Sequence, residues 1–463
     1  MPLPLPIGRQ REVLYLPAEG HVAVLGTAGS GKTTLAILRS AYLSDPSTAH
    51  TGPTLLVTFN RALVVYLRHL ASPQLRNVQV ENYHVFARGY LGWRRKMQND
   101  CICTPELREQ LIEEAVLEVA GGLKDHPITA YSSHFYSNVV RWTYQLGYVT
   151  EKDVMLGLVS GSYGLNEEIA GLVLAVRRAY EARRKSAGKL YDWDDIAIAV
   201  DQEMAVDDSE RMYTHVVIDE GQDFSPVMIH SLTRAAGKDG SVTFFGDVAQ
   251  QIYGSRFSWR SAGLKVTKPW LFEENYRNTK QIADLALALT KQPFYRGLAD
   301  LVTPRSPRAA GPLPALVRCA DTNREIDFVL RAAKSAARTG TAAILVRNRE
   351  DERLFTSSLR EKDYIRLYRD MNIWQPDTGL YIGTYHGAKG LEFDSVFMPR
   401  LSRDRIPDPA TVEADGHEIA DSAEAKLLYV GITRARQTLV LCHTGIVTDL
   451  LPSENALYQK STT

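Results

Sequence analysis

Short apolar runs alternate with longer amphipathic segments along most of the 463-residue chain. Each run is bounded by polar or glycine-containing residues, which is typical of buried strands in a parallel sheet. We expect strands at 22–25, 54–60, 78–80, 215–218, 242–245, 342–346, 379–383, 395–398 and 438–441. Strands that alternate with helical segments indicate an α/β fold with two α/β units.

Residues 90–188 interrupt this alternation with a mostly helical pattern. Thr104 is a typical N-cap, and Pro105 suits the first helical position. Apolar residues then recur at four-residue spacing until Gly121 ends the run. A second helix is expected over about 166–188, and its arginine-rich end is either a solvated face or a phosphate contact. We interpret this block as a helical insertion in the first α/β unit.

Length and charge set wide bounds on function. The length allows two to four domains with sizeable cores. Lys and Arg together number 54, as do Asp and Glu, so the formal net charge is zero. A nucleic-acid-binding protein of this composition must therefore gather its basic residues locally, for example in a groove.

Cysteine usage and the apolar runs indicate a cytoplasmic protein. Only four cysteines occur, at 101, 103, 319 and 442, which is too few and too scattered for a disulfide framework. The C-x-C pair at 101–103 has no second pair nearby, so we do not expect a zinc site. The first nine residues lack the features of a signal peptide, and no run approaches the ~18 apolar residues of a membrane span.

The strongest chemical signal is a phosphate-binding loop. The stretch Gly26-Thr27-Ala28-Gly29-Ser30-Gly31-Lys32-Thr33 matches G-x-x-x-x-G-K-[ST] in full, between an expected strand and an expected helix. Its glycines let backbone N–H groups converge on phosphate oxygens at a helix N-terminus. Lys32 would reach the β- and γ-phosphates, and the Thr33 hydroxyl would ligate Mg²⁺.

Paired carboxylates follow a later buried strand. Asp219 and Glu220 come directly after the run at 215–218. Behind a phosphate-binding loop, Asp219 would hold Mg²⁺ and Glu220 would orient or deprotonate the attacking water. Gln250 follows the next strand and could sense the γ-phosphate through that water.

Two further groups of residues depend on context. Arg277 and Arg434 are candidates for cations supplied to the γ-phosphate from across a domain cleft. Phe59, Asn60 and His84 stand at strand ends, where aromatic and polar groups meet a ligand lying across the carboxyl edge of a parallel sheet. Aromatic residues that cap a core are the alternative at each strand end.

The ordered set of motifs resembles the UvrD/Rep-type superfamily 1 helicases. The resemblance spans nearly the whole chain and rests on Gln10, 26–34, 56–60, 83–86, 191–195, 217–223, 245–254, 274–278, 384–393 and 427–435. It implies two RecA-like P-loop NTPase domains, with ATP in the cleft and single-stranded DNA across their top. The expected domains are 1–92 with 190–270, a helical insertion at 93–189, and 271–463.

The resemblance also implies individual roles. Gln10 would read adenine, Tyr276 would stack on the base, and Glu392 would contact the ribose. The loop residues Gly26 to Thr34 would hold the phosphates, Gln250 would couple nucleotide state to the strand, and Arg277 and Arg434 would be arginine fingers. The single-strand track would be lined by Phe59, Asn60, His84, Tyr253, Arg256 and His386.

Such a protein would be an ATP-dependent translocase or helicase that moves 3′ to 5′ on single-stranded DNA, acting on 3′-tailed duplexes. Only about a hundred residues separate Arg277 from Thr384, so the mobile domain that larger relatives insert there is not expected. The alternative is a nucleotide-sensing ATPase subunit beside a nuclease or in an antiphage defence complex, an analogy with compact family members.

The chain departs from the family pattern at three positions. Thr34 stands where many members carry an Arg against adenine. Ser255 replaces a Trp that helps to ratchet bases, and Phe257 or Trp259 could substitute for it. Gly221 replaces the usual Ala of the acidic motif, a change that we expect to be tolerated.

Overall fold

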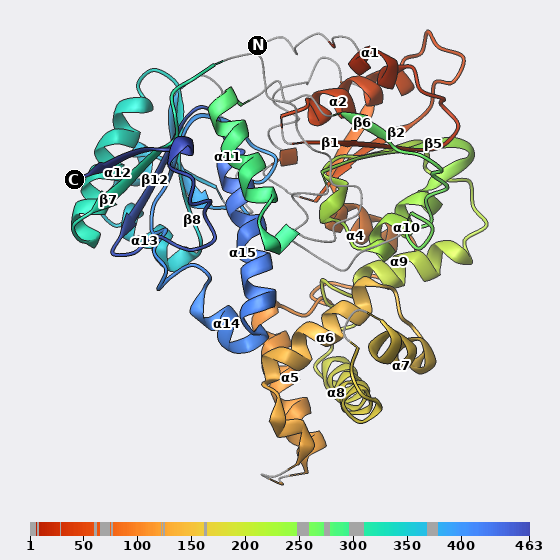
Figure 1. Cartoon of the computed structure of the whole chain (residues 1–463). Helices are drawn as coiled ribbons and strands as arrows, with labels where there is room; N and C mark the ends of the chain where they lie inside the picture. Colours follow the sequence, from red (N-terminus) through yellow and green to blue (C-terminus); the bar gives the residue numbers. More distant parts are fainter. Residues whose placement is uncertain are drawn as a thin grey trace.

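A computed structural model describes residues 6, 9–27, 29–59, 63–64, 75, 77–121, 123, 126–161, 164–247, 259–272, 278–295, 310–367 and 378–463. These residues form two parallel sheets, each covered by helices, with a group of helices beneath the first (Figure 1). We call the described residues up to Phe272 the first half and those from Asn278 onward the second half. The predicted α/β fold with two RecA-like units is confirmed.

The first sheet has six strands in the order β3-β2-β4-β5-β1-β6, and every neighbouring pair is parallel. The strands are β1 (Gly20–Gly26), β2 (Thr54–Thr58), β3 (Val78–Asn82), β4 (Tyr213–Ile218), β5 (Ala236–Gly246) and β6 (Trp270–Phe272). The strands β1 and β4 are central and adjacent to β5, so the loops that follow them lie side by side at the carboxyl edge. The apolar runs predicted all of these strands except β6.

Alternation along β2 shows how this sheet is covered on both faces. Leu55 and Val57 pack into the core beneath α4 (Tyr83–Trp93), α9 (Ile196–Ala205) and α10 (Pro226–Ala235). Leu56 packs into the opposite core with α2 (Lys32–Leu43), on the side where α1 (Arg9–Leu14) lies. Because both faces are buried, the strand is an unbroken apolar run rather than an alternating one.

The second sheet is also entirely parallel, with seven strands in the order β13-β7-β12-β11-β8-β10-β9. They are β7 (Ala315–Cys319), β8 (Thr341–Val346), β9 (Ile365–Leu367), β10 (Gly379–Thr384), β11 (Phe393–Met398), β12 (Ala435–Thr444) and β13 (Gln459–Thr462). The helices α11 (Lys280–Thr290) and α15 (His417–Ile432) cover one face. The other face is covered by α12 (Thr322–Ala336) and α13 (Arg349–Thr356).

The helical insertion consists of α5 (Pro105–Ala120), α6 (Ser133–Gln145), α7 (Glu151–Ser160) and α8 (Glu167–Ser186). The predicted start of α5 is confirmed, because the Thr104 hydroxyl accepts a hydrogen bond from the backbone N–H of Leu107 at 3.3 Å. Gly121 ends the helix in a left-handed conformation with φ of 59°. The basic end of α8 is only partly a solvated face: Arg178 and Lys185 are exposed, whereas Arg177 and Arg184 are buried and paired inside the protein.

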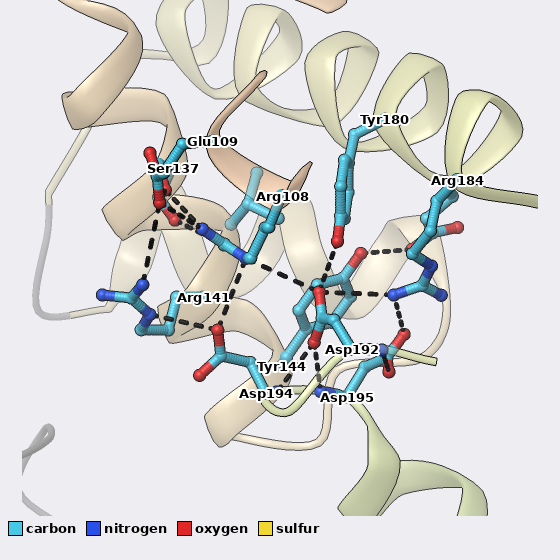
Figure 2. Close-up of polar contacts among 12 residues, drawn as sticks. Arg108, Glu109, Ser137, Arg141, Tyr144, Tyr180, Arg184, Asp192, Asp194 and Asp195 are labelled. Atoms are coloured by element: carbon cyan, nitrogen blue, oxygen red, sulfur yellow. Dashed lines mark hydrogen bonds and ion pairs between the residues drawn. The ribbon is translucent and has the colours of Figure 1, made fainter. Parts of the chain in front are cut away.

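Figure 2 shows how Arg184 joins α8 to the segment that leads back to the first sheet. Arg184 is buried and lies 2.6 Å from Asp195 and 3.3 Å from Asp192. Asp192 also accepts a hydrogen bond from the Tyr180 hydroxyl at 2.6 Å, and Arg108 of α5 lies 3.5 Å from it. Burial raises the pKa of Asp192, but Arg184 and Arg108 outweigh this effect and hold it below its usual value.

Residues 403–416 contain the helix α14 (Pro409–Asp415). The Asp408 carboxylate caps its N-terminus by accepting a hydrogen bond from the backbone N–H of Thr411 at 3.3 Å. The helix packs on α15 and also contacts α6 of the helical insertion, so it joins the second half to the insertion. Within the described residues, no helix has the length and apolar character to cross a membrane.

The buried cluster around Asp192 predicts a large stability effect. Asp192→Ala leaves Arg108 and Arg184 short of a partner, and removing one member of a buried ion pair costs about 3–5 kcal/mol. Glu118→Ala is the control, because it removes an exposed partner of Arg183, a change expected to cost about 1 kcal/mol or less. Urea unfolding followed by circular dichroism measures both. Equal losses for the two variants would contradict the assignment.

Candidate nucleotide and nucleic-acid site

The phosphate-binding loop lies between β1 and α2, as the sequence predicts. Gly29 and Gly31 adopt left-handed conformations with φ of 80° and 85°, which glycine adopts without strain. Gly31 is also the N-cap of α2, and no side chain caps that helix start. The hydroxyls of Thr27 and Ser30 are buried and have no hydrogen-bond partner among the described residues. The loop therefore presents donor groups at a helix N-terminus, as an anion site requires.

Gln10 lies directly against this loop. Its amide Nε2 donates a hydrogen bond to the Ser30 carbonyl at 2.9 Å, and a Cβ added to Gly31 would stand 3.0 Å from the same nitrogen. A residue from α1 thus borders the phosphate-binding loop.

Lys32 is almost completely buried in the loop. Its ammonium donates to the carbonyls of Gly26 and Thr27 at 2.9 and 2.8 Å and lies 4.0 Å from Asp247. Thr33 and Thr34 follow in the first turn of α2, both half-buried. The charge of Lys32 is therefore held at the centre of the loop, next to the carboxylate of Asp247.

Asp219 and Glu220 follow β4 at the same edge of the sheet and are both buried. Glu220 adopts a left-handed conformation with φ of 53°, which costs a residue with a side chain about 1–3 kcal/mol and is found mainly at functional sites. Burial and the Glu220 charge raise the pKa of Asp219. Burial also raises the pKa of Glu220, but Lys32, Arg434 and Lys389 outweigh it and lower that pKa below its usual value.

The acidic pair fits a divalent cation. Both carboxylate oxygens of Asp219 are buried without a hydrogen bond of normal geometry from a described residue. The Thr33 hydroxyl is near enough to lower the pKa of this carboxyl, as is Lys32. Carboxylate and hydroxyl oxygens beside a phosphate-binding loop are the donor set that Mg²⁺ takes.

The second half supplies two cations to this acidic pair. Arg434 is fully buried, and its guanidinium donates to the Val430 and Leu391 carbonyls at 3.0 and 3.3 Å. Lys389 forms an ion pair with Asp223, which lies in the short 3-10 helix Gly221–Asp223 after β4. Burial raises the pKa of Asp223 to about 6, although Lys389 opposes this effect. The two halves therefore meet at the acidic motif through charged groups.

Three residues that the sequence analysis gave no role complete this arrangement. Lys389 is the first. The second is Gln222, whose side chain donates to Glu220 and accepts a hydrogen bond from the backbone N–H of Asp247 at 2.8 Å. The third is Asp247, which follows β5 and faces Lys32. Each of the three residues lies inside one of the family motifs at 217–223, 245–254 and 384–393. Their positions in these motifs could have identified them as site residues.

Glu392 lies near Arg434, because both of its neighbours in the chain form hydrogen bonds with that residue. The carbonyl of Leu391 accepts from the Arg434 guanidinium, and the N–H of Phe393 donates to the Arg434 carbonyl at 3.0 Å. The half-buried Glu392 lies between these two residues. Its predicted contact with the ribose stays a prediction.

Aromatic rings gather at the carboxyl edge of the first sheet. The ring of His84 lies 5.7 Å from Phe59 and 5.0 Å from Trp193, centroid to centroid. Phe59 also meets Phe224 at 5.9 Å. In the second half, His386 follows β10, and burial, Arg347 and Lys389 lower its pKa to about 4. His386 is therefore neutral near pH 7 and suited to stacking or hydrogen bonding rather than to charge pairing.

Several predicted site residues lie outside the described residues. These are Ala28, Asn60, Gln250, Tyr253, Arg256, Tyr276 and Arg277. Of the three departures from the family pattern, Thr34 and Gly221 lie within the described residues and Ser255 lies outside them, as does Phe257. Trp259, the other candidate to substitute for the missing Trp, packs edge-on against Phe244 at 5.2 Å, so its ring takes part in the core of the first half. A Cβ on Gly221 would stand 2.2 Å from the same Phe244 ring, so this position requires glycine.

The protein is a P-loop ATPase with two RecA-like domains. Its two parallel sheets, its phosphate-binding loop and the acidic motif that cations of the second half approach define this class. Its family follows from comparison with known proteins. Residues 8–268 match the UvrD/REP helicase N-terminal domain, and residues 370–445 match the UvrD-like helicase C-terminal domain. The chain belongs to the UvrD/REP helicase family, a family of ATP-dependent DNA helicases.

Curated relatives are distant in sequence. A probable DNA helicase of Mycoplasma pneumoniae is 22% identical, over 96% of this chain and 83% of that protein. The ATP-dependent DNA helicase UvrD2 of Mycobacterium bovis is 22% identical, over 94% of this chain and 78% of its own length. DNA helicase II of Haemophilus influenzae is 24% identical over 60% of this chain, which spans only 39% of that protein.

The contact between Gly221 and Phe244 predicts the effect of restoring the family's usual residue. Gly221→Ala forces the buried Phe244 ring to move, and overpacking of this kind costs about 1–3 kcal/mol. The control is Gly171→Ala in α8, where an added Cβ meets nothing within 4 Å; we expect it to stabilise the protein by about 0.4–1 kcal/mol. Thermal unfolding by calorimetry compares the two, and an unchanged melting temperature for Gly221→Ala would be the contrary result.

Proposed function

We propose that the protein is an ATP-driven translocase that moves 3′ to 5′ on single-stranded DNA and separates duplex DNA ahead of it. Family membership supports ATP-dependent action on DNA. The direction of movement and the translocase activity are inferred from the resemblance of the motifs.

One observation carries the proposal. Lys32 from the first half and Arg434 and Lys389 from the second all lower the pKa of Glu220. Cations from two separately folded sheets thus act on one buried carboxylate beside the phosphate-binding loop. A nucleotide bound at this loop would be enclosed by both halves, so its hydrolysis would change how the halves attract one another.

We assign the residues of the site the following roles. Lys32 binds the β- and γ-phosphates, exchanging its bonds to the Gly26 and Thr27 carbonyls for charge-assisted ones. Thr33 and Asp219 would hold Mg²⁺, which neutralises charge on the phosphates when bound. Glu220 orients the attacking water and accepts its proton, which a carboxylate with a lowered pKa can do because it remains ionised.

The cations of the second half act on the transferred phosphoryl group. Arg434 is the arginine finger that lies within the described residues, and Arg277 is proposed as the second. Gln10, Tyr276 and Glu392 are proposed to hold the adenosine, and Gln250 to couple the nucleotide to the strand.

The strand is proposed to cross the carboxyl edges of both sheets. Phe59, His84 and His386, with Asn60, Tyr253 and Arg256, would contact it there. Aromatic stacking on bases is worth roughly 1–3 kcal/mol per base and is indifferent to sequence. This tolerance suits a motor that must pass over any DNA. The domain limits 1–92 with 190–270, 93–189 and 271–463 are proposed as the moving units.

Removal of the loop lysine tests the nucleotide site. Lys32→Ala and Glu220→Gln are expected to abolish ATP hydrolysis, whereas the exposed Lys238→Ala retains it. Phosphate release is measured with no nucleic acid, single-stranded DNA, duplex DNA or RNA. We expect the wild-type rate to rise with single-stranded DNA. Stimulation by RNA alone would refute the proposed substrate.

Arg434 provides a sharper test because an arginine follows two residues later. Arg434→Lys is expected to lower turnover about 10³-fold or more, the usual contribution of an arginine finger. Arg436→Lys changes an exposed side chain and is expected to have little effect. Normal turnover by Arg434→Lys would contradict the assignment of Arg434 as an arginine finger.

The direction of movement has its own test. Unwinding of 3′-tailed but not 5′-tailed duplexes by the wild-type protein would support movement from 3′ to 5′ on single-stranded DNA.

A further inference from the structure

A buried acid in the middle of α15 has no part in the site described above. Glu424 is fully buried. The Arg347 Nε and Nη2 atoms both lie 2.5 Å from its Oε1 atom. Its second oxygen has no hydrogen-bond partner among the described residues. A buried carboxylate with one cationic partner cannot release that partner cheaply, because the charge left behind would be neither solvated nor paired.

Arg347 places this ion pair at the edge of the second sheet where single-stranded DNA is proposed to bind. It directly follows β8, at the carboxyl edge of the second sheet. The neighbouring β10 ends at Thr384, and Tyr385 then donates its N–H to the Val346 carbonyl at 3.0 Å. Arg347 is also near enough to His386 to lower the pKa of that residue. One side chain thus links α15 to the segment that would contact DNA.

The C-terminal end of the same helix holds the arginine finger. Ile432, the last residue of α15, is eight positions after Glu424, a distance of about 12 Å at 1.5 Å per residue. Arg434 follows at once and is fixed to this end, because its Nε atom donates to the Val430 carbonyl at 3.0 Å. Movement of α15 as a rigid body would therefore move Arg434.

The segment beside Arg347 is also firmly held. Asp351 in α13 is buried and accepts a hydrogen bond from Arg405 at 2.8 Å, while Arg400 lies 3.4 Å from it. These two arginines belong to the segment between β11 and α14. Because α14 packs on α15 and contacts α6, the helix that carries Glu424 is braced from the sheet and from the insertion.

We propose that Glu424 is a positioning residue that couples DNA binding near His386 to the placement of Arg434 through helix α15. The inference rests on the proposed function. Single-stranded DNA that shifts the loops after β8 and β10 would move Arg347. The buried ion pair between Arg347 and Glu424 would transmit this movement to α15. Glu424 itself contacts neither nucleotide nor DNA.

The test separates stimulated from basal ATP hydrolysis. Glu424→Gln keeps the shape of the side chain but removes its charge, which weakens its hold on Arg347. We expect the stimulation of ATP hydrolysis by oligo(dT) to fall about tenfold, the usual size of a coupling free energy between sites. The basal rate and the affinity for fluorescent oligo(dT) are expected to stay at wild-type values. Glu418→Gln, an exposed acid on the same helix, is the matched control.

Each outcome has a defined meaning. A purely structural role would lower basal and stimulated rates together with the melting temperature, and this result would overturn the proposal, as would full stimulation of Glu424→Gln. If Glu424→Gln does not fold, Arg347→Lys provides the test, because lysine keeps the charge but loses the second contact with Glu424. Normal stimulation of ATP hydrolysis in Arg347→Lys would then overturn the proposal. An unstimulated wild-type protein would refute the proposed function itself, and the coupling with it.

Discussion

The arrangement of this protein depends on a pair of buried carboxylates that receive compensating positive charge from both halves. Asp219 and Glu220 lie side by side out of water, and an unpaired buried charge costs several kcal/mol. Lys32 provides one compensating charge from within the first half, and Arg434 and Lys389 provide the others from the second. Contact between the halves is therefore part of what stabilises the acidic motif. Because these attractions are between charges, any ligand that brings charge into the cleft changes the balance between the halves.

The chemistry of this contact differs from that of the two cores. Each sheet is held by apolar clusters on both faces, which resist rearrangement because interiors are close-packed. Between the halves, by contrast, the described contacts include a buried ion pair, that of Lys389 with Asp223. Polar interfaces between domains usually permit relative motion. Rigid units joined by a polar, charge-dependent contact are what a motor driven by a charged nucleotide requires.

Sequence alone predicted most of the sheet framework, because buried parallel strands are short apolar runs that can be recognised locally. It also predicted that Lys32, Asp219 and Glu220 follow strands that end at one edge of the sheet, since strand ends in a parallel sheet share that edge. It could not assign Lys389, whose partner Asp223 is 166 residues away. It could not single out Arg184 within the basic run of α8 for the same reason, because a run of basic residues has the same pattern whether its members face water or buried aspartates. The need for glycine at 221 arises from Phe244, on a different strand.

The anchoring of the helical insertion follows from the same physics. Arg108, Arg184 and Asp192 lie at the junction between the insertion and the first sheet, where a purely apolar joint could repack in several ways. Charged groups in a buried joint must keep their partners, so one orientation of the insertion is selected. The segment that holds Asp192 continues into Trp193, whose ring meets His84. The orientation of the insertion is therefore tied to the aromatic edge of the first sheet, where the strand is proposed to bind, and through α14 to the second half as well.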